Sequence, residues 1–147
     1  MNRPHFDAIY MNLALMLAKR STCSRAHVGC VIATVDNQRV LAVGYNGGAK
    51  GVFNDCLSIE PGQCGHAHSE TNALVKCNYN VPTLKKMYVT MSPCFACSVL
   101  IVNAGVSEVI YLHEYRKTEG TELLKKAGVT VRQLSERDIQ IDEDAQV

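Results

Sequence analysis

Two short motifs constrain this chain more than any other feature, because both hold metal-ligating side chains at fixed spacings. The first is H-S-E, which contains His68 and Glu70, and the second is P-C-F-A-C, which contains Cys94 and Cys97. Zinc is commonly bound by one imidazole and two thiolates, which leaves the fourth tetrahedral position open to water. A nearby carboxylate that is not a ligand shuttles protons for such a water. The motifs therefore predict a zinc site made of His68, Cys94 and Cys97, with Glu70 as its acid and base.

Both motifs lie where the sequence predicts the start of a helix. Ser92-Pro93 is a favourable helix start, with the serine as the cap and the proline in the first position. Cys94 and Cys97 are then three residues apart and point to one face of the helix. The helix dipole and a metal both lower the pKa of a thiol, so both cysteines are expected to bind as thiolates. A second helix over residues 67–77 would hold the H-S-E motif in its first turn.

The hydrophobic pattern predicts strands and helices that alternate along most of the chain. An amphipathic helix comes first, a hairpin of two strands follows, and three more strands then alternate with helices. In chain order, the elements are expected at residues 5–20, 28–35, 40–45, 67–77, 87–90, 92–104, 108–111, 118–127 and 129–132. Strands that alternate with helices pair in parallel and are covered by those helices. We therefore predict an α/β fold with a five-stranded mixed sheet and helices on both faces.

The length of the chain limits the number of domains. At 147 residues, with no internal repeat, linker or low-complexity tract, the chain is expected to form a single domain over residues 1–147. The acidic tail, residues 133–147, is expected to be ordered only in part. Residues 46–66 are rich in glycine and predict a long loop, and a loop of this length in a compact domain usually has a function.

Composition limits the classes of partner. The net charge is +1, whereas proteins that bind long nucleic acids usually need a basic face. The sequence has no apolar run of about 18 residues that could span a membrane. Its seven cysteines follow no secretory signal and are expected to be metal ligands or buried thiols rather than disulfides. We expect a cytoplasmic protein that binds neither nucleic acid nor a membrane.

Two further segments point to a family. Residues 20–29 contain R-S-T-C-x-R-x-x-V-G, and residues 44–56 contain G-Y-N-G-x-x-x-G followed by D-C. H-x-E followed by P-C-x-x-C is the signature of zinc nucleobase deaminases. With all these segments, the chain resembles the deoxycytidylate (dCMP) deaminases of the cytidine deaminase superfamily, phage and bacterial type, over roughly residues 5–131. The family's usual tripeptide is H-A-E, and Ser69 keeps the middle residue small.

The resemblance implies a three-layer cytidine-deaminase-like fold and an activity. That activity is the zinc-dependent hydrolysis of dCMP to dUMP and ammonia, which supplies dUMP for dTMP synthesis. Arg25 would hold the 5′-phosphate, Asn46 would bond to the 3′-hydroxyl of the deoxyribose, and Tyr115 would pack near the base and phosphate. The alternatives are that Arg25 is a solvated surface arginine and that Tyr115 is an ordinary core or surface tyrosine.

Some phage-type members of this family carry a second, structural zinc. Here the residues that the resemblance offers for it are Cys23, Cys56, Cys64 and His66. A closed site of three cysteines and one histidine would pin the 46–66 loop. The alternative is that Cys23 and Cys56 are buried thiols and that His66 is an exposed loop residue. The remaining two cysteines, Cys30 and Cys77, are expected in the core.

Enzymes of this family are typically homohexamers that dCTP activates and dTTP inhibits, with Mg²⁺ on the triphosphate. The resemblance therefore also implies a homo-oligomer and an effector site. The residues that it offers for effector contact are Tyr45, Asn46 and Gly47 of the G-Y-N-G segment, together with Lys50.

Two rival interpretations remain open from the sequence. One is a deaminase that acts on free cytidine or on a base in tRNA or single-stranded DNA. The neutral charge, the absence of tryptophan and the small number of aromatic residues weaken its nucleic-acid form, because such sites use basic grooves and stacking side chains. The other is a non-catalytic zinc module for protein interaction, which would leave Glu70 without a role.

Overall fold

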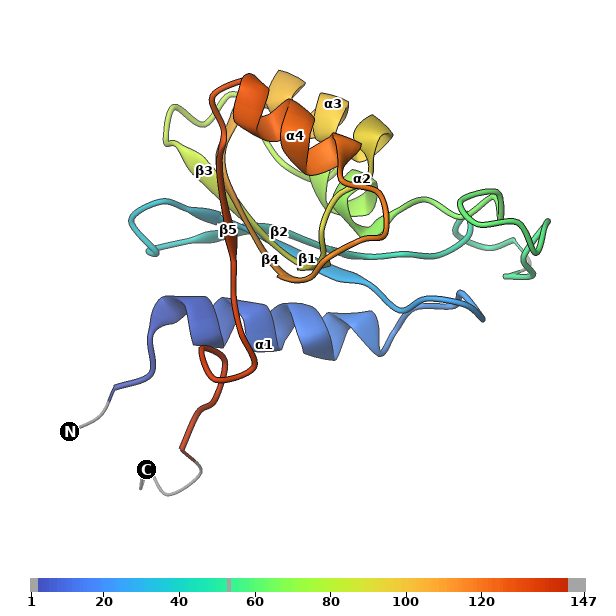
Figure 1. Ribbon diagram of the computed structural model, residues 1–147, viewed down its shortest axis with the longest axis horizontal. Coiled ribbons are helices and arrows are strands. Elements are labelled where there is room, and N and C mark those ends of the chain that lie inside the picture. Colours follow the sequence, from blue (N-terminus) through green and yellow to red (C-terminus); the bar gives the residue numbers. More distant parts are fainter. Residues whose placement is uncertain (1–2, 53, 143–147) are drawn as a thin grey trace.

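One sheet separates the N-terminal helix from the three later helices in the computed structural model, which describes residues 3–52 and 54–142 (Figure 1). The elements follow the predicted order. They are α1 (Phe6–Ala18), β1 (Gly29–Thr34), β2 (Val40–Tyr45), α2 (Ser69–Leu74), β3 (Lys85–Met91), α3 (Phe95–Asn103), β4 (Val106–His113), α4 (Glu119–Lys126) and β5 (Thr130–Gln133). The prediction of a five-stranded mixed sheet with helices on both faces is confirmed.

The sheet brings the carboxyl ends of four strands, β2, β3, β4 and β5, to one side. Its strand order is β2-β1-β3-β4-β5, with β1 antiparallel to both β2 and β3, and with β3, β4 and β5 parallel. Because β1 runs against both neighbours, β2 has the same direction as β3 and β4. Ligands of open α/β sheets bind outside the carboxyl ends of the strands. The segments that follow β2, β3 and β4 are therefore the place to look for a site.

The core has two layers, one on each face of the sheet. Every residue of β1 is buried. Cys30 and Ile32 belong to the cluster on the side of α2, α3 and α4, while Val31 and Ala33 belong to the cluster beneath α1. Cys77 lies in the first cluster, so both cysteines expected in the core are there. Alternate residues of one strand thus serve both layers.

Glycines allow helices to approach at backbone distance, and two of these contacts, at Gly44 and Gly120, lie beside the site. A Cβ atom at Gly44 in β2 would clash with the carbonyl oxygen of Ser69 and would lie 2.6 Å from the backbone nitrogen of Ala73 in α2. A Cβ atom at Gly120 in α4 would clash with the carbonyl oxygen of Pro93, in the segment that leads into α3. The absence of a side chain at these two positions fixes how closely α2 and α4 pack.

The helices differ from their predicted bounds where the chain tightens into turns. The helix predicted over 67–77 is regular only over Ser69–Leu74, so Cys77 lies beyond its end and not within it. The helix predicted from Ser92 begins at Phe95. It ends as predicted at Gly105, which follows the C-cap with φ of 75°. Within the described ranges, no helix is both long and apolar enough to cross a membrane.

The chain after β5 packs against α1. Leu134 and Ile139 are buried in the α1 cluster, and the side-chain amide of Asn12 donates to the carbonyl oxygen of Ile139 at 2.7 Å. Of the tail predicted to be ordered in part, Gln133 thus belongs to a strand, and Leu134 and Ile139 reach the core. Residues 143–147 lie outside the described part of the chain.

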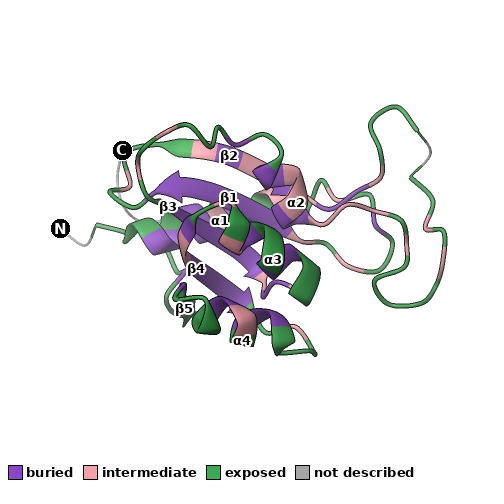
Figure 2. Cartoon of the chain, turned by 90° about the horizontal axis from the view of Figure 1, so that it is seen from above, coloured by how far each residue is buried: buried purple, intermediate pink, exposed green. Residues whose placement is uncertain are grey.

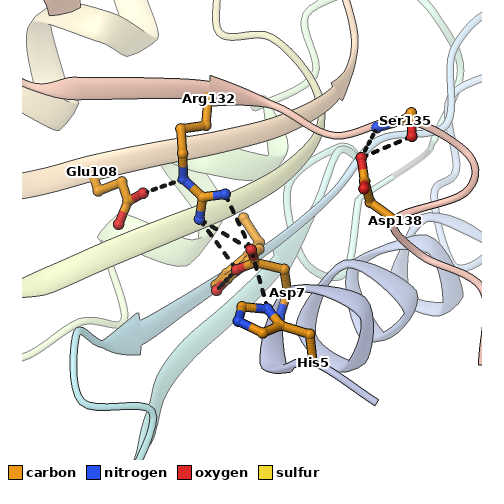
Figure 3. A network of polar contacts seen from close by, with 7 residues as sticks. His5, Asp7, Glu108, Arg132, Ser135 and Asp138 are labelled. Atoms are coloured by element: carbon orange, nitrogen blue, oxygen red, sulfur yellow. Dashed lines mark hydrogen bonds and ion pairs between the residues drawn. The ribbon is translucent and has the colours of Figure 1, made fainter. Parts of the chain in front are cut away.

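A charged network joins α1 to the far edge of the sheet (Figure 3). Arg132 of β5 donates to both carboxylate oxygens of Asp7 and, at 2.6 Å, to Glu108. The Tyr88 hydroxyl also donates to Asp7, at 2.6 Å. Burial by itself would raise the pKa of Asp7, but the bonds from Arg132 and Tyr88 and the Arg132 charge outweigh it, and this pKa falls below its usual 3.8.

We predict that this network contributes stability that disappears in acid. A carboxyl whose pKa is lower in the folded state stabilises the fold above its unfolded pKa and loses that contribution as the pH falls through the folded value. Asp7→Asn should lower the free energy of unfolding at pH 7 by about 2 kcal/mol. At pH 2 the variant and the parent should be nearly equal in stability. Urea unfolding from pH 7 to pH 2 measures this difference, and a gap that stays constant over the whole range would contradict it.

Candidate metal centre and cavity

Three of the predicted zinc ligands meet at the carboxyl edge of the sheet. His68 is the N-cap of α2, Cys94 is the N-cap of α3, and Cys97 lies in the first turn of α3. Nδ1 of His68 lies 3.5 Å from Sγ of Cys94 and 3.4 Å from Sγ of Cys97. One ligand atom from each residue lies within 4.8 Å of the others. This donor set, two soft sulfurs and one imidazole nitrogen, fits zinc.

The cap of α3 is the cysteine, and the serine predicted for that position has another partner. Sγ of Cys94 accepts a bond from the backbone N–H of Cys97 at 3.5 Å. Ser92 instead joins the ends of β3 and β4: its hydroxyl oxygen accepts the backbone N–H of Tyr115 at 2.6 Å, and its own N–H donates to His113. The prediction that Ser92 caps α3 was wrong, because the Ser92 hydroxyl is engaged in this long-range hydrogen bond.

The pKa values of the two thiols, Cys94 and Cys97, shift in opposite directions. The hydrogen bond from the Cys97 thiol, with those from His68 and the Cys97 backbone, lowers the pKa of Cys94 to about 4 in spite of burial. The bond donated to Cys94 and burial raise the pKa of Cys97. A metal would take the place of the shared proton, and both sulfurs would then bind as thiolates.

Glu70 is a buried carboxyl beside this cluster. Only 4% of the residue is exposed, and its Oε2 accepts a hydrogen bond from the hydroxyl of Ser69 at 2.8 Å. Burial raises the pKa of Glu70 above its usual value of 4.5, and the bond from Ser69 opposes this only in part. A raised pKa makes a carboxylate a stronger proton acceptor, which suits a general base. The serine that replaces the usual alanine of the motif therefore also contacts the candidate base.

A cavity of about 380 Å³ opens in front of the cluster. Nine of the residues singled out in the sequence line it: Cys23, Arg25, Asn46, Cys64, His66, His68, Glu70, Cys94 and Tyr115. The volume suits a ligand of a few hundred daltons. The long connections before β1 and after β2 extend from the same end of the molecule (Figure 2). The carboxyl edge of the sheet thus provides the floor of the cavity, and these connections provide part of its wall.

The mouth of the cavity carries two exposed arginines. Arg25 lines the cavity, and Arg116 lies there as well. The guanidinium of Arg116 lies 5.3 Å from the centre of the Tyr115 ring and donates to the Tyr115 hydroxyl at 3.2 Å. The sequence reasoning missed Arg116 and the neighbouring Glu114, which also lines the cavity. Their position directly after β4, at a carboxyl strand end, was the signal that could have identified them.

The side chain of Asn46 is already engaged with the backbone. Its Oδ1 accepts the N–H of Val28 at 2.9 Å, and its Nδ2 donates to the carbonyl of Ala26 at 2.7 Å. These bonds hold the segment after Arg25 against the end of β2. An amide has two donors and two acceptor sites, so one of each remains for a ligand.

A second group of potential ligands adjoins the first. Cys23, Cys56, Cys64 and His66 each place a ligand atom within 4.8 Å of the others. Nδ1 of His66 is buried without a hydrogen-bond partner, while Nε2 lies 3.1 Å from the carbonyl oxygen of Asn54. A metal-ligating histidine typically uses its other nitrogen in this way. The donor set and the unpartnered nitrogen fit a closed zinc site.

Of the residues considered for effector contact, one lines the cavity and three do not. Asn46 lines the cavity, whereas Tyr45, Gly47 and Lys50 do not. The guanidinium of Arg20 lies 5.5 Å from the centre of the Tyr45 ring. Gly47 is buried and bonded through its backbone to Ala67, and Lys50 is exposed. The structure thus does not gather these residues into the catalytic cavity.

Comparison with known proteins places these features in context. A family model described as the cytidine and deoxycytidylate deaminase zinc-binding region matches residues 4–113. A deoxycytidylate deaminase of Saccharomyces cerevisiae is 40% identical over 90% of this chain, and one of a Mycobacterium phage is 35% identical over 78% of it. The crystal structure of the dCMP deaminase from cyanophage S-TIM5 with dCMP and dUMP superposes with a TM-score of 0.78 and 35% identity, covering 91% of this chain and all of that one.

The relatives differ in length. This chain spans 46% of the yeast protein, 99% of the Mycobacterium phage protein and 100% of the cyanophage chain. The superposition shows that the three-layer fold is cytidine-deaminase-like, as the resemblance implied. The family model covers both zinc motifs and most of the sheet. The chain therefore belongs to the cytidine and deoxycytidylate deaminase family.

Proposed function

We propose that this chain catalyses the zinc-dependent hydrolysis of dCMP to dUMP and ammonia. The observation that carries the proposal is the arrangement of one cavity. A ligand set for zinc and a buried carboxyl, Glu70, lie at its floor, and two arginines lie at its mouth. The relatives named deoxycytidylate deaminase support the choice of substrate.

His68, Cys94 and Cys97 would hold the zinc ion. When bound, zinc supplies a Lewis acid that makes water at the fourth position acidic. Glu70 accepts a proton from the water that attacks C4 of the cytosine ring, and it delivers this proton to ring N3. Glu70 then passes the second water proton to the exocyclic amine. The bond from C4 to this nitrogen breaks, ammonia leaves, and the water oxygen remains as the new carbonyl oxygen.

Arg25 and Arg116 would bind the 5′-phosphate. Guanidinium groups make charge-assisted hydrogen bonds to phosphate, and both side chains line the mouth of the cavity. Asn46 would use its remaining donor and acceptor on the 3′-hydroxyl, and Tyr115 would pack beside the base. A phosphate site at the mouth favours a nucleotide over free cytidine. The non-catalytic zinc module remains the weaker rival, because it gives no reason to bury the Glu70 carboxyl beside the ligands.

A second zinc ion would have a structural role. Cys23, Cys56, Cys64 and His66 supply four ligands and leave no open position, which is typical of structural sites. We further propose that the protein works in the cytoplasm, supplying dUMP for dTMP synthesis, and has no nucleic-acid partner.

The assembly and regulation proposed for the chain follow the family. We propose a homohexamer, activated by dCTP and inhibited by dTTP with Mg²⁺, and contact of the effector with the Tyr45–Gly47 segment and Lys50. Exposed apolar side chains on α3 support self-association: Phe95 is 56% exposed and Leu100 is 45% exposed.

We predict ammonia release from dCMP but not from cytidine, deoxycytidine or a single-stranded oligonucleotide. Glu70→Gln should lower kcat by about a thousandfold, because it removes the acid and base. Zinc content by mass spectrometry should stay at the level of the parent. Glu119→Gln, an exposed position on α4, is the matched control.

Two outcomes would contradict this proposal. Full turnover by Glu70→Gln would remove the assigned base. A zinc-loaded parent that releases ammonia from none of the four substrates would favour the non-catalytic module.

The phosphate site makes a separate prediction. Arg25→Ala should lower kcat/KM for dCMP by at least about tenfold, because a charge-assisted hydrogen bond is lost. Any residual activity on deoxycytidine, which has no phosphate, should not fall in parallel. Arg39→Ala, in the hairpin at the other end of the sheet, is the control. Equal losses on both substrates would show that Arg25 does not recognise the phosphate.

Regulation is tested by adding triphosphates to the assembled protein. With Mg²⁺, dCTP should lower the KM for dCMP and dTTP should raise it, and Lys50→Ala should weaken both responses. Light scattering should give the mass of six chains of 16.1 kDa each. Turnover that ignores both triphosphates would remove the regulatory proposal, and a monomeric mass would remove the hexamer.

A further inference from the structure

The loop between β2 and α2 has almost no core of its own. Residues 54–66 contain no helix or strand, and their large apolar side chains point outward: Leu57 is 83% exposed and Ile59 is 88% exposed. One backbone bond, from the N–H of Leu57 to the carbonyl of Cys64 at 2.9 Å, closes the loop on itself. Burial of apolar surface therefore contributes little to its shape.

The cysteine–histidine cluster lies at the base of this loop. Cys56, Cys64 and His66 come from the loop, and Cys23 comes from the segment before β1. An ion held by all four residues would fasten the loop to that segment. The buried Nδ1 of His66, which has no hydrogen-bond partner, is the atom in this cluster that such an ion would satisfy.

The same cluster forms part of the cavity wall. Cys23, Cys64 and His66 line the cavity, and so do Arg25, two residues after Cys23, and Gly62, two residues before Cys64. This half of the wall consists of loop segments. Most of the remaining lining lies at the ends of β2, β3 and β4 and at the starts of α2 and α3, which the sheet and the packed helices position.

A backbone bridge separates the two halves. Ala67 lies between His66 and His68, and it exchanges two hydrogen bonds with Gly47, at 3.0 and 3.1 Å. The position of His68 is therefore fixed by the end of β2, whether or not the loop beyond His66 is held. A change in the loop should therefore displace Arg25 but not the ligands His68, Cys94 and Cys97.

We propose that the cluster of Cys23, Cys56, Cys64 and His66 is a metal-dependent clamp on the substrate entrance. Its ion sets the affinity for the phosphate end of the nucleotide and takes no part in the reaction. The proposal deepens the function proposed above and rests on it for its kinetic test, and its structural test is independent of turnover.

The test compares Cys56→Ser and His66→Gln, which remove ligands from opposite ends of the loop, with Ile59→Ala, an exposed position of the same loop. The two ligand variants should contain one zinc ion per chain where the parent contains two. Their KM for dCMP should rise by at least about tenfold, with kcat within about threefold of the parent. Calorimetry should show a matching loss of affinity for dUMP. Hydrogen exchange should become faster over residues 22–26 and 54–66 but not in α2 or α3.

Several outcomes would overturn the clamp. One zinc ion per chain in the parent, retained in both ligand variants, would show that the cluster holds no zinc. Loss of one ion with unchanged KM and dUMP affinity would make the site purely structural, while the deaminase function would stand. If the parent binds two ions but turns over no substrate, the proposed function fails, and slow exchange that persists in both ligand variants would overturn the clamp as well. Thermal unfolding of each variant identifies any that has failed to fold.

Discussion

The close contact between α2 and β2 at Gly44 is the constraint on which the site depends. No side chain separates the helix from the sheet there, so the height of α2 above the strand is set by the two backbones. His68 caps this helix and Glu70 lies in its first turn. Gly120 has the same effect on the segment that leads to Cys94. Catalytic groups lose much of their effect when displaced by about 1 Å, and backbone contacts hold a position more rigidly than flexible side chains do.

Among the described residues, Asp7 and Glu70 are buried carboxyls whose environments shift the pKa in opposite directions. Asp7 is held by the guanidinium of Arg132 and the hydroxyl of Tyr88, and its pKa is lowered. Glu70 is deeply buried, accepts one hydroxyl bond, and its pKa is raised. The first remains charged and fastens α1 to the far edge of the sheet. The second is the group that exchanges protons in the function proposed above. The environment, and not the residue type, divides structural from chemical roles.

The sequence predicted the element order, the mixed sheet and the grouping of His68, Cys94 and Cys97, because hydrophobic period and ligand spacing are local patterns. The prediction failed where residues that are distant in the sequence bind the same group or line the same cavity. Ser92 has the chemistry of a helix cap, but the backbone of Tyr115, which is remote in sequence, takes its hydroxyl. Arg116 was missed because its position after β4 becomes a site position only when β4 lies beside β3 and ends at the cavity. Which side chains meet at the ends of neighbouring strands depends on the strand order of the sheet and not on a local motif.

The bridge between Gly47 and Ala67 has a consequence for how this chain can change over time. The chain between these two residues is a loop whose ends are joined by two backbone hydrogen bonds. Insertions or deletions there change the length of the loop but leave the distance from the end of β2 to His68 unchanged. Long surface loops tolerate such changes at a small entropic cost. Changes in this loop can therefore alter the entrance of the cavity without moving His68 at its floor.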